Sequence, residues 1–435
     1  MTSEEKQIPL YPLLLINFIG TLGFSIVLPF LVFLVIDFGG NAIVYGILAA
    51  MYPAFQLIGA PILGRWSDTY GRKKVLLLSH GGTLVGWIIF LCALFLPVEN
   101  LFTINSALIG TFIITIPLVI LFLARALDGI TGGNISVANA YLADVSSDVN
   151  RSKNFGKMAI SSNLGFIVGP AIAGILGATI YKEIFPVLAA LSLSLVTLIV
   201  IVFTLKESKP TATATADVIQ VLEKGNIGKV FAQECKECYK IVNPKKLTFL
   251  DIFKLKHISF LLFLYFFIFL GFNIFYTSFP IHAVVDLKWS ITQMGIFYAV
   301  LSGIMVLVQG PVLRKALQKF SEEKLVIIGS LILGTNFILF VSNETLLIYV
   351  AAILFAVGNG LMWPSFMSIF SKRAGYVYQG AIQGVGSSFA GLASIIGLTI
   401  GGVLYNLIGG NTFLISAGII FVVFIMSFRL LKIKE

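Results

Sequence analysis

Long apolar stretches, each close to the length of a membrane-spanning helix, fill most of this 435-residue chain. A helix needs about 20 apolar residues to cross the hydrocarbon core of a bilayer. Membrane-spanning strands would instead alternate polar and apolar residues, and these stretches do not alternate. We therefore predict an all-α membrane protein with twelve transmembrane helices. The predicted spans cover residues 10–36, 42–64, 75–96, 117–143, 157–180, 185–205, 258–282, 290–313, 325–342, 346–370, 378–405 and 411–431.

The composition excludes a soluble protein. Hydrophobic residues make up 58% of the chain and charged residues 11%, whereas a soluble domain carries about 25% charged residues. The mean hydropathy of +0.98 shows that most of the length, and not one anchor, is apolar. A soluble enzyme could not cover its surface with so few charges.

The positive charges are distributed unevenly, and this accounts for the net charge of +10 without nucleic-acid binding. All but three of the 30 lysines and arginines fall in the N-terminus, the even-numbered loops and the C-terminus; the exceptions are Lys182, Lys288 and Arg125. Loops rich in lysine and arginine stay in the cytoplasm. We expect a multi-pass plasma-membrane protein (inner membrane in a bacterium) with both termini cytoplasmic. Three cysteines give no disulfide framework.

Residues 97–116 are apolar enough to suggest a thirteenth helix. Counting them as a span would reverse the side of every later loop and export Arg151, Lys153 and Lys157. We therefore interpret this segment as an extracellular loop that contains an interfacial segment or an extended helix start.

A polar, lysine-rich segment divides the predicted spans six and six. We predict an N-terminal six-helix half at 1–205, a cytoplasmic linker at 206–257 and a C-terminal six-helix half at 258–435. Two pseudo-symmetric halves with a binding site between them are typical of secondary transporters.

The two predicted halves keep traces of an internal repeat. Residues 64–78 and 314–328 occupy the same loop in each half and share length and rhythm. GPAIAG at 169–174 in the fifth span corresponds to GLTIGG at 397–402 in the eleventh. The repeat supports the division into two halves.

The loop GRWSDTYGRKK, between the second and third spans, combines one carboxylate with several cations. Gly71 permits a tight turn, and Asp68 can pair with Arg72 or lie near the positive end of a neighbouring helix. The string resembles the G-x-x-x-D-x-x-G-R-[RK] signature of the major facilitator superfamily, where the aspartate and arginine form a cytoplasmic gating latch between the halves. The resemblance implies that Asp68 and Arg72 form that latch, with Gly64 and Gly71 as its hinges.

The fifth span carries closely spaced glycines and a proline. Glycines three or four residues apart let another helix approach closely, and a proline kinks the helix. The pattern resembles the antiporter signature of the superfamily's drug/proton exporters, with alanine in place of one glycine; ordinary helix packing is the alternative. The motif residues are Gly156, Gly165, Gly169, Pro170 and Gly174.

Three longer strings resemble the tetracycline/proton antiporters of the same superfamily. They are YGILAAMYPAFQLIGAPILG at 45–64, LARALDGITGGNISVANAYLADVSSDVNRSKNFG at 123–156 and GVGSSFAGLASIIG at 384–397. Those antiporters carry a carboxylate in span one where this chain has Gly20, and another in span three where it has Gly86. The departure puts tetracycline itself in doubt as the substrate.

Away from the span ends, the sequence places two charged residues inside the predicted spans: Arg125 and Asp128, three apart on one face of span four. Charges in the bilayer are costly and therefore mark functional sites. We predict that this pair couples transport to protons. The alternative is a permanent ion pair that satisfies two buried charges, in which case Asp37, His80 or Asp286 would carry the proton.

Polar side chains within the spans are candidates for the wall of a substrate cavity, although each one could instead make a helix–helix hydrogen bond. These residues are Asn17, Tyr52, Gln56, Asn139, Asn163, Asn273, Tyr276, Gln293, Asn359, Trp363 and Gln383.

The leading hypothesis is a secondary active transporter that exports a small, drug-like or antibiotic compound by proton antiport with alternating access. A proton-coupled carrier for a metabolite or siderophore is the alternative, and a non-transporting receptor is a third reading. The chain lacks the G-x-x-x-x-G-K-[ST] loop that ATP drive would require. We expect no enzyme activity, no cofactor and no metal site. The expected partners of this monomer are its substrate, protons and the lipid bilayer.

Overall fold

The computed structural model describes most of the chain, and its described ranges are 9–27, 29–106, 110–132, 134–146, 148–208 and 257–432. The predicted linker at 206–257 therefore lies almost entirely outside the described residues.

The first six predicted spans form helices. The first span is divided between α1 and α2, where Pro29 lacks the backbone N–H that a continuous helix needs. The fourth span is divided between α5 and α6 next to Gly132. The helices are α1 (Tyr11–Ser25), α2 (Leu31–Asp37), α3 (Ala42–Tyr70), α4 (Arg72–Ala93), α5 (Ile116–Thr131), α6 (Asn134–Val145), α7 (Asp148–Gly177) and α8 (Ile184–Thr204).

The last six predicted spans also form helices, with short irregular turns at some ends. A π-helical turn, η2, follows α12, and 3-10 turns flank α16. The elements are α11 (Ile258–Val285), α12 (Ile291–Leu307), η2 (Val308–Val312), α13 (Leu313–Leu317), α14 (Glu322–Leu339), α15 (Thr345–Ile408), η3 (Gly409–Asn411), α16 (Thr412–Ser427) and η4 (Phe428–Lys432).

The long helix α15 contains two membrane spans. A methyl group on Gly386 would lie 2.9 Å from the ring of Phe370, although a straight helix would hold these residues about 24 Å apart. The chain therefore reverses direction between them, as predicted for spans 346–370 and 378–405.

Within the described residues, nine helical stretches are long and apolar enough to cross a membrane. The twelve-span count follows from three further observations. The α1 helix is apolar but short, α14 begins with the charged run Glu322, Glu323 and Lys324, and the stretch 384–432 contains the end of α15 and α16, separated by η3. The fold is that of a twelve-helix membrane protein.

Of residues 97–116, the structure describes 97–106 and 110–116, and these are not helical before Ile116, where α5 begins. They contain strands β1 (Asn100–Ser106) and β2 (Gly110–Thr115), which pair antiparallel. The hairpin is fixed to the α2–α3 loop because Ile113 N–H donates to the Gly39 carbonyl at 2.8 Å and the Thr115 hydroxyl donates to the Phe38 carbonyl at 2.9 Å. Where an interfacial segment or an extended helix start was expected, the described residues thus form a β-hairpin.

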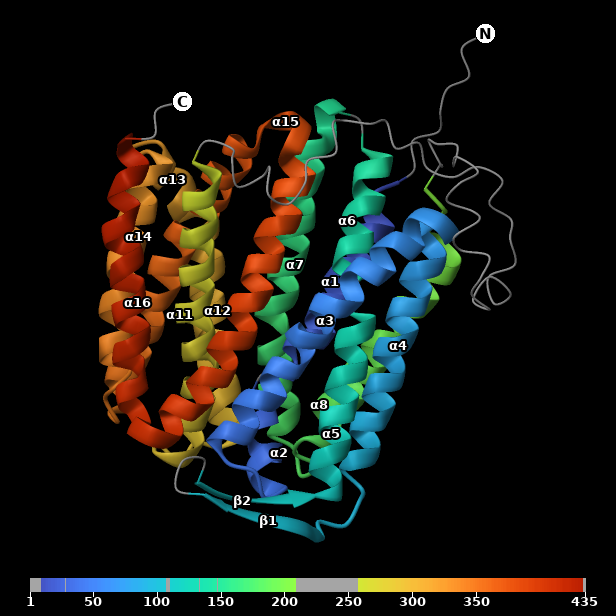
Figure 1. Ribbon diagram of the computed structural model, residues 1–435, viewed down its shortest axis with the longest axis vertical. Coiled ribbons are helices and arrows are strands. Elements are labelled where there is room, and N and C mark those ends of the chain that lie inside the picture. Colours follow the sequence, from blue (N-terminus) through green and yellow to red (C-terminus); the bar gives the residue numbers. More distant parts are fainter. Residues whose placement is uncertain are drawn as a thin grey trace.

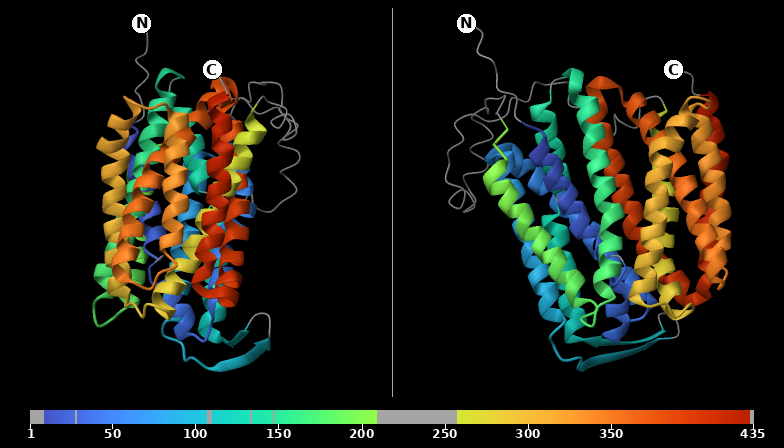
Figure 2. Two further views of the ribbon diagram at one scale, coloured as in Figure 1. Left: turned by 90° about the vertical axis from the view of Figure 1, so that its left-hand side faces the viewer. Right: turned by 180° about the vertical axis from the view of Figure 1, so that it is seen from behind.

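The helices form two groups that lie side by side, and the helices of both groups run between the same two ends of the bundle (Figure 1). Helices α1–α8 lie on one side and α11–α16 on the other, with the hairpin and α2 at one end of the bundle (Figures 1 and 2). We call this the hairpin end; α1 begins and α16 finishes at the opposite end.

Glycines bring the two groups into backbone contact toward the hairpin end. A methyl group on Gly46 of α3 would lie 2.6 Å from the carbonyl oxygen of Leu398 and 3.1 Å from Cα of Gly402, both on α15. Gly174 of α7 lies directly against Gly295 of α12 in the same way. No larger side chain fits at either crossing without moving a helix.

The two crossings are related by the internal repeat. Gly174 and Gly402 occupy the same place in the repeated strings GPAIAG and GLTIGG. Five residues earlier in each string, Gly169 packs on Leu22 of α1, and Gly397 packs on Leu270 of α11. Each half therefore contributes the same pair of packing surfaces, as the repeat predicts.

The buried core also differs between the two ends. One cluster combines α3 residues such as Val44 and Tyr45 with Ile281, Ile291 and Tyr405 from the second group of helices. Two other clusters near the opposite end each draw their described members from one group alone. Among the described residues, core packing between the halves is thus concentrated at the hairpin end.

We predict that Gly174→Ala destabilises the protein. The added methyl group overlaps the backbone of Gly295, and overpacking of this kind costs about 1–3 kcal/mol. The melting temperature in detergent should fall. The matched control is Gly303→Ala on α12, where a methyl group meets no atom within 4 Å, so the higher helix propensity of alanine keeps or raises the melting temperature. Equal melting of the two variants would contradict the close crossing.

Candidate functional site

The α3–α4 loop holds the predicted latch residues in one cluster. Gly71 has a φ of 100° and joins the two helices. The Arg72 guanidinium lies 2.5 Å from Asp68 and 2.9 Å from Asp144 of α6, and it also donates to the Ser67 hydroxyl at 2.6 Å. Gly64 faces open space. The predicted Asp68–Arg72 pair is present, and its partners shown here belong to the first group of helices.

Sequence reasoning missed how the segment that follows α8 completes this cluster. Glu207 accepts the backbone N–H of Arg72 at 2.7 Å and that of Lys73 at 3.1 Å. A carboxylate at this place stabilises the positive N-terminal end of α4, a role that the sequence analysis considered for Asp68. Nothing in the local sequence connects Glu207 with a helix that begins 135 residues earlier.

The intramembrane pair Arg125 and Asp128 is formed in the structure. Arg125 Nη1 lies 3.3 Å from Asp128 Oδ2, and both side chains are almost fully buried. The guanidinium carbon also lies 5.6 Å from the ring centre of Phe24 and 5.2 Å from that of Tyr52. Arg125 Nε has no hydrogen-bond partner among the described residues. A single long contact, instead of a two-bond fork, joins the two charges.

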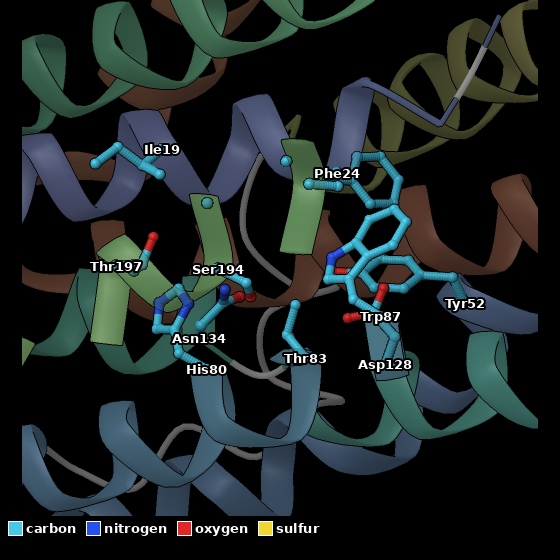
Figure 3. Close-up of a pocket in the computed structure, with 13 residues that line it drawn as sticks. Ile19, Phe24, Tyr52, His80, Thr83, Trp87, Asp128, Asn134, Ser194 and Thr197 are labelled. Carbon is cyan, nitrogen blue, oxygen red and sulfur yellow. The ribbon is translucent and has the colours of Figure 1, made fainter. Parts of the chain in front are cut away.

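Asp128 faces a small cavity inside the first group of helices (Figure 3). The cavity encloses about 30 Å³, which is room for one or two water molecules and not for a drug. His80 lies at the other side of it, next to Asn134 (Figure 3). Its lining residues are Ile19, Gly20, Gly23, Phe24, Tyr52, His80, Thr83, Trp87, Asp128, Asn134, Ala190, Ser194 and Thr197.

Gly20 and Gly86, where the tetracycline/proton antiporters carry acids, face the two ionisable groups of this cavity. A methyl group on Gly20 would lie 3.3 Å from Cε1 of His80, and one on Gly86 would lie 3.4 Å from Cβ of Asp128. Ionisable side chains on facing helices therefore occupy the surroundings of both glycines. One sequence could not reveal this, because the facing residues lie far apart in the chain.

The glycines of the fifth-span motif pack on two different helices. Gly165 and Gly169 lie against α1, and the Ser25 hydroxyl donates to the Gly165 carbonyl at 2.9 Å. Gly174 instead contacts α12 of the other half. Pro170 lies inside α7 between these surfaces. Gly156 belongs to α7, but its surroundings lie outside the described part of the structure.

In the first group of helices, the predicted cavity-wall residues mostly join one helix to another. Asn17 donates to the Ser162 hydroxyl at 2.7 Å, and Gln56 donates to the Gly132 carbonyl at 2.7 Å. Tyr52 lines the Asp128 cavity. Asn139 lies on α6, and the side chain of Asn163 is outside the described part of the chain.

In the second group, Trp363 lies 5.4 Å from the ring of Tyr265, and Tyr276 belongs to the aromatic cluster around Phe275. Asn273 donates to Ser394 at 3.0 Å. The remaining predicted wall residues take other places. Gln293 forms the capping box at the start of α12, Asn359 lies beside Met305, and the Gln383 side chain is not described.

The acids at the hairpin end occupy two separate places. Asp37 ends α2 near Glu183, in the loop before α8. Burial raises the pKa of the Glu183 carboxyl, and the negative charge of Asp37 adds to that shift. Asp286 follows α11 and contacts His282 and Tyr405.

Two six-helix halves that meet through glycine crossings, with an ionisable pair buried between helices, define a secondary membrane transporter. The chain belongs to the Major Facilitator Superfamily, whose sequence profile matches residues 13–387.

Curated relatives resemble the chain over nearly its whole length. It is 29% identical to the class E tetracycline resistance protein of Escherichia coli, covering 90% of this chain and 87% of that protein. It is 28% identical to multidrug resistance protein 1 of Bacillus subtilis (strain 168), covering 93% and 91%.

Solved structures share the fold. The D-xylose-proton symporter superposes with a TM-score of 0.70 at 14% identity, covering 96% of this chain and 97% of that chain. The human organic anion transporter MFSD10 (TETRAN) gives a TM-score of 0.64 at 19% identity, covering 98% and 100%.

We predict that Asp68→Asn slows transport strongly but leaves the protein folded, because Asp144 and Ser67 still hold Arg72. Asp68 is 59% exposed, and exposed ion pairs contribute at most about 1 kcal/mol to stability. The initial transport rate in proteoliposomes tests the loss of transport, and the melting temperature tests whether the protein stays folded. A wild-type rate would show that Asp68 is not part of a working latch.

Proposed function

We propose that this transporter exports a small, mostly apolar organic compound in exchange for protons. The observation that carries the proposal is Asp128, a carboxylate buried beside a water-sized cavity and joined to Arg125 by one long contact. Resemblance to tetracycline and multidrug resistance proteins supports export of a drug-like compound, and it favours export over the metabolite or siderophore alternative.

The geometry around Asp128 suits a group that gains and loses a proton. Water in the cavity would bring the proton to the carboxylate, and protonation would remove the charge that holds Arg125. The guanidinium already lies 5.6 Å from the ring centre of Phe24 and 5.2 Å from that of Tyr52, and aromatic rings attract a cation without a carboxylate. Arg125 would therefore tolerate the neutral state of Asp128.

The two halves would move as units, residues 1–205 against 258–435, with 206–257 as their cytoplasmic linker. The asymmetry of lysines and arginines supports cytoplasmic termini and a plasma-membrane location, with the hairpin end outside. Because backbone contacts join the halves at the hairpin end, this conformation would be closed to the outside. The latch of Asp68 and Arg72 would close the cytoplasmic side in the opposite conformation.

The substrate would bind between the halves, since the Asp128 cavity is too small for a drug. A compound panel tested in proteoliposomes with an imposed proton gradient would identify it. Uptake into inverted vesicles that depends on the gradient is the expected result.

We predict that Asp128→Asn abolishes transport driven by a pH gradient but retains exchange of substrate down its own gradient. The amide keeps the shape of the carboxylate and cannot carry the proton. The measurement compares both kinds of transport in proteoliposomes.

Glu344→Gln at the start of α15 is the matched control, because it makes the same chemical change outside the cavity. It should transport like the wild type. If Asp128→Asn still concentrates substrate when driven by pH, Asp128 is a structural partner of Arg125 and not the proton carrier.

A further inference from the structure

A second group of ionisable side chains lies in the other half of the molecule, at the hairpin end. His282, near the end of α11, places its Nδ1 atom 2.8 Å from Asp286 Oδ2 and 2.9 Å from the Tyr405 hydroxyl of α15. The Tyr405 hydroxyl also donates a hydrogen bond to Asp286. The three side chains therefore share one proton network.

The network joins a buried ring to the surface. The His282 side chain is 1% exposed and the Asp286 side chain 36% exposed, so water reaches the carboxylate but not the imidazole. His282 Nε2 is buried and has no hydrogen-bond partner among the described residues. A buried, unpartnered nitrogen on a titratable ring is costly to keep, and structural packing alone does not require a histidine here.

The groups that face the ring from its neighbours are few. Phe413 of α16 meets it edge-on at 5.3 Å, and a methyl group on Gly410 of η3 would lie 3.6 Å from its Cε1 atom. The other charged residues of the hairpin end belong to α2 (Asp37), the loop before β1 (Glu99), the loop before α8 (Lys182 and Glu183), the α11–α12 loop (Lys288) and the start of α15 (Glu344). Within the described residues, no hydrogen bond or ion pair joins any of them to the ring. Its titratable partners are thus Asp286 and Tyr405.

The network lies directly behind the seam between the halves. Tyr405 lies one turn after Gly402, which contacts Gly46 of α3. Ile281, next to His282, and Tyr405 both belong to the buried cluster that contains residues of α3. A change in the network therefore acts on the residues that close the hairpin end.

We propose that His282, Asp286 and Tyr405 form a second proton-binding site, which takes up a proton at the hairpin end and favours opening of that end. The site rests on the proposed orientation of the hairpin end toward the outside. It is separate from Asp128, which lies in the first half.

The proton balance is simple. One proton from the water that reaches Asp286 joins the histidine–aspartate pair, whose net charge changes from −1 to zero; the proton belongs to the pair as a whole. With the proton on the ring, Nε2 becomes an N–H donor in a place that offers no acceptor. An opening of the seam that admits water to that nitrogen would satisfy the new donor, so protonation would stabilise the open arrangement relative to the closed one.

The test measures opening directly and needs no substrate. In a background of Cys92→Ser, Cys235→Ser and Cys238→Ser, the variant Ile291→Cys places a thiol in the seam, where Ile291 meets Gly177. A membrane-impermeant maleimide added outside reports exposure of this thiol. Lys288→Cys, exposed on the same side, corrects for the effect of pH on the labelling chemistry.

The corrected labelling rate of Ile291→Cys should rise severalfold when the external pH falls from about 8 to about 6. His282→Asn keeps a donor toward Asp286 but cannot titrate, and it should abolish the rise. His257→Asn, at the other end of α11, should preserve it. Tyr405→Phe removes a donor to Asp286 and should shift the rise to higher pH.

Two results would overturn the site: labelling that does not depend on pH in the parent protein, or a full rise that persists in His282→Asn. If His282→Asn fails to insert into the membrane, Tyr405→Phe decides the question. A network without a proton-binding role predicts no shift in the pH midpoint of labelling for that variant. The outcome is independent of the proposed export. Asp128→Asn should keep the pH-dependent labelling even where it loses pH-driven transport.

Discussion

Backbone contact between glycines is the constraint on which the rest of this structure depends. At two crossings, Gly46 with Gly402 and Gly174 with Gly295, one half touches the other without an intervening side chain. Lipid offers no hydrophobic drive for helix association, so close packing of small residues must hold the helices together. The internal repeat places both crossings at the same end, and that end is therefore the one that the conformation shown here keeps closed.

Buried charge is the second constraint, and the two halves meet it differently. The first half keeps Arg125 and Asp128 beside a cavity with room for one or two water molecules. The second half connects a buried His282 to the surface through Asp286. In the proposed mechanism, each arrangement would give a proton a place to bind. The two halves would then respond to protons at separate sites.

The spans and their pairing into halves could be predicted from apolar length and repeated glycines, because both signals are local. Helix breaks were harder to predict. Pro29 lies between α1 and α2, yet Pro53, Pro61 and Pro170 lie inside unbroken helices. Contacts between residues distant in the sequence could not be predicted. Glu207 accepts hydrogen bonds from the start of α4, and His80 faces Gly20. Both contacts depend on how the helices pack, which no single stretch of sequence specifies.

If the halves rock about these seams, distances between spin labels at the two ends of the bundle change in opposite directions. One pair joins Tyr181 to Lys288 at the hairpin end, and the other joins Arg65 to Lys319 at the opposite end; all four side chains are exposed. On acidification the first distance should lengthen while the second shortens. Distances that both stay constant, or that change in the same direction, would contradict it.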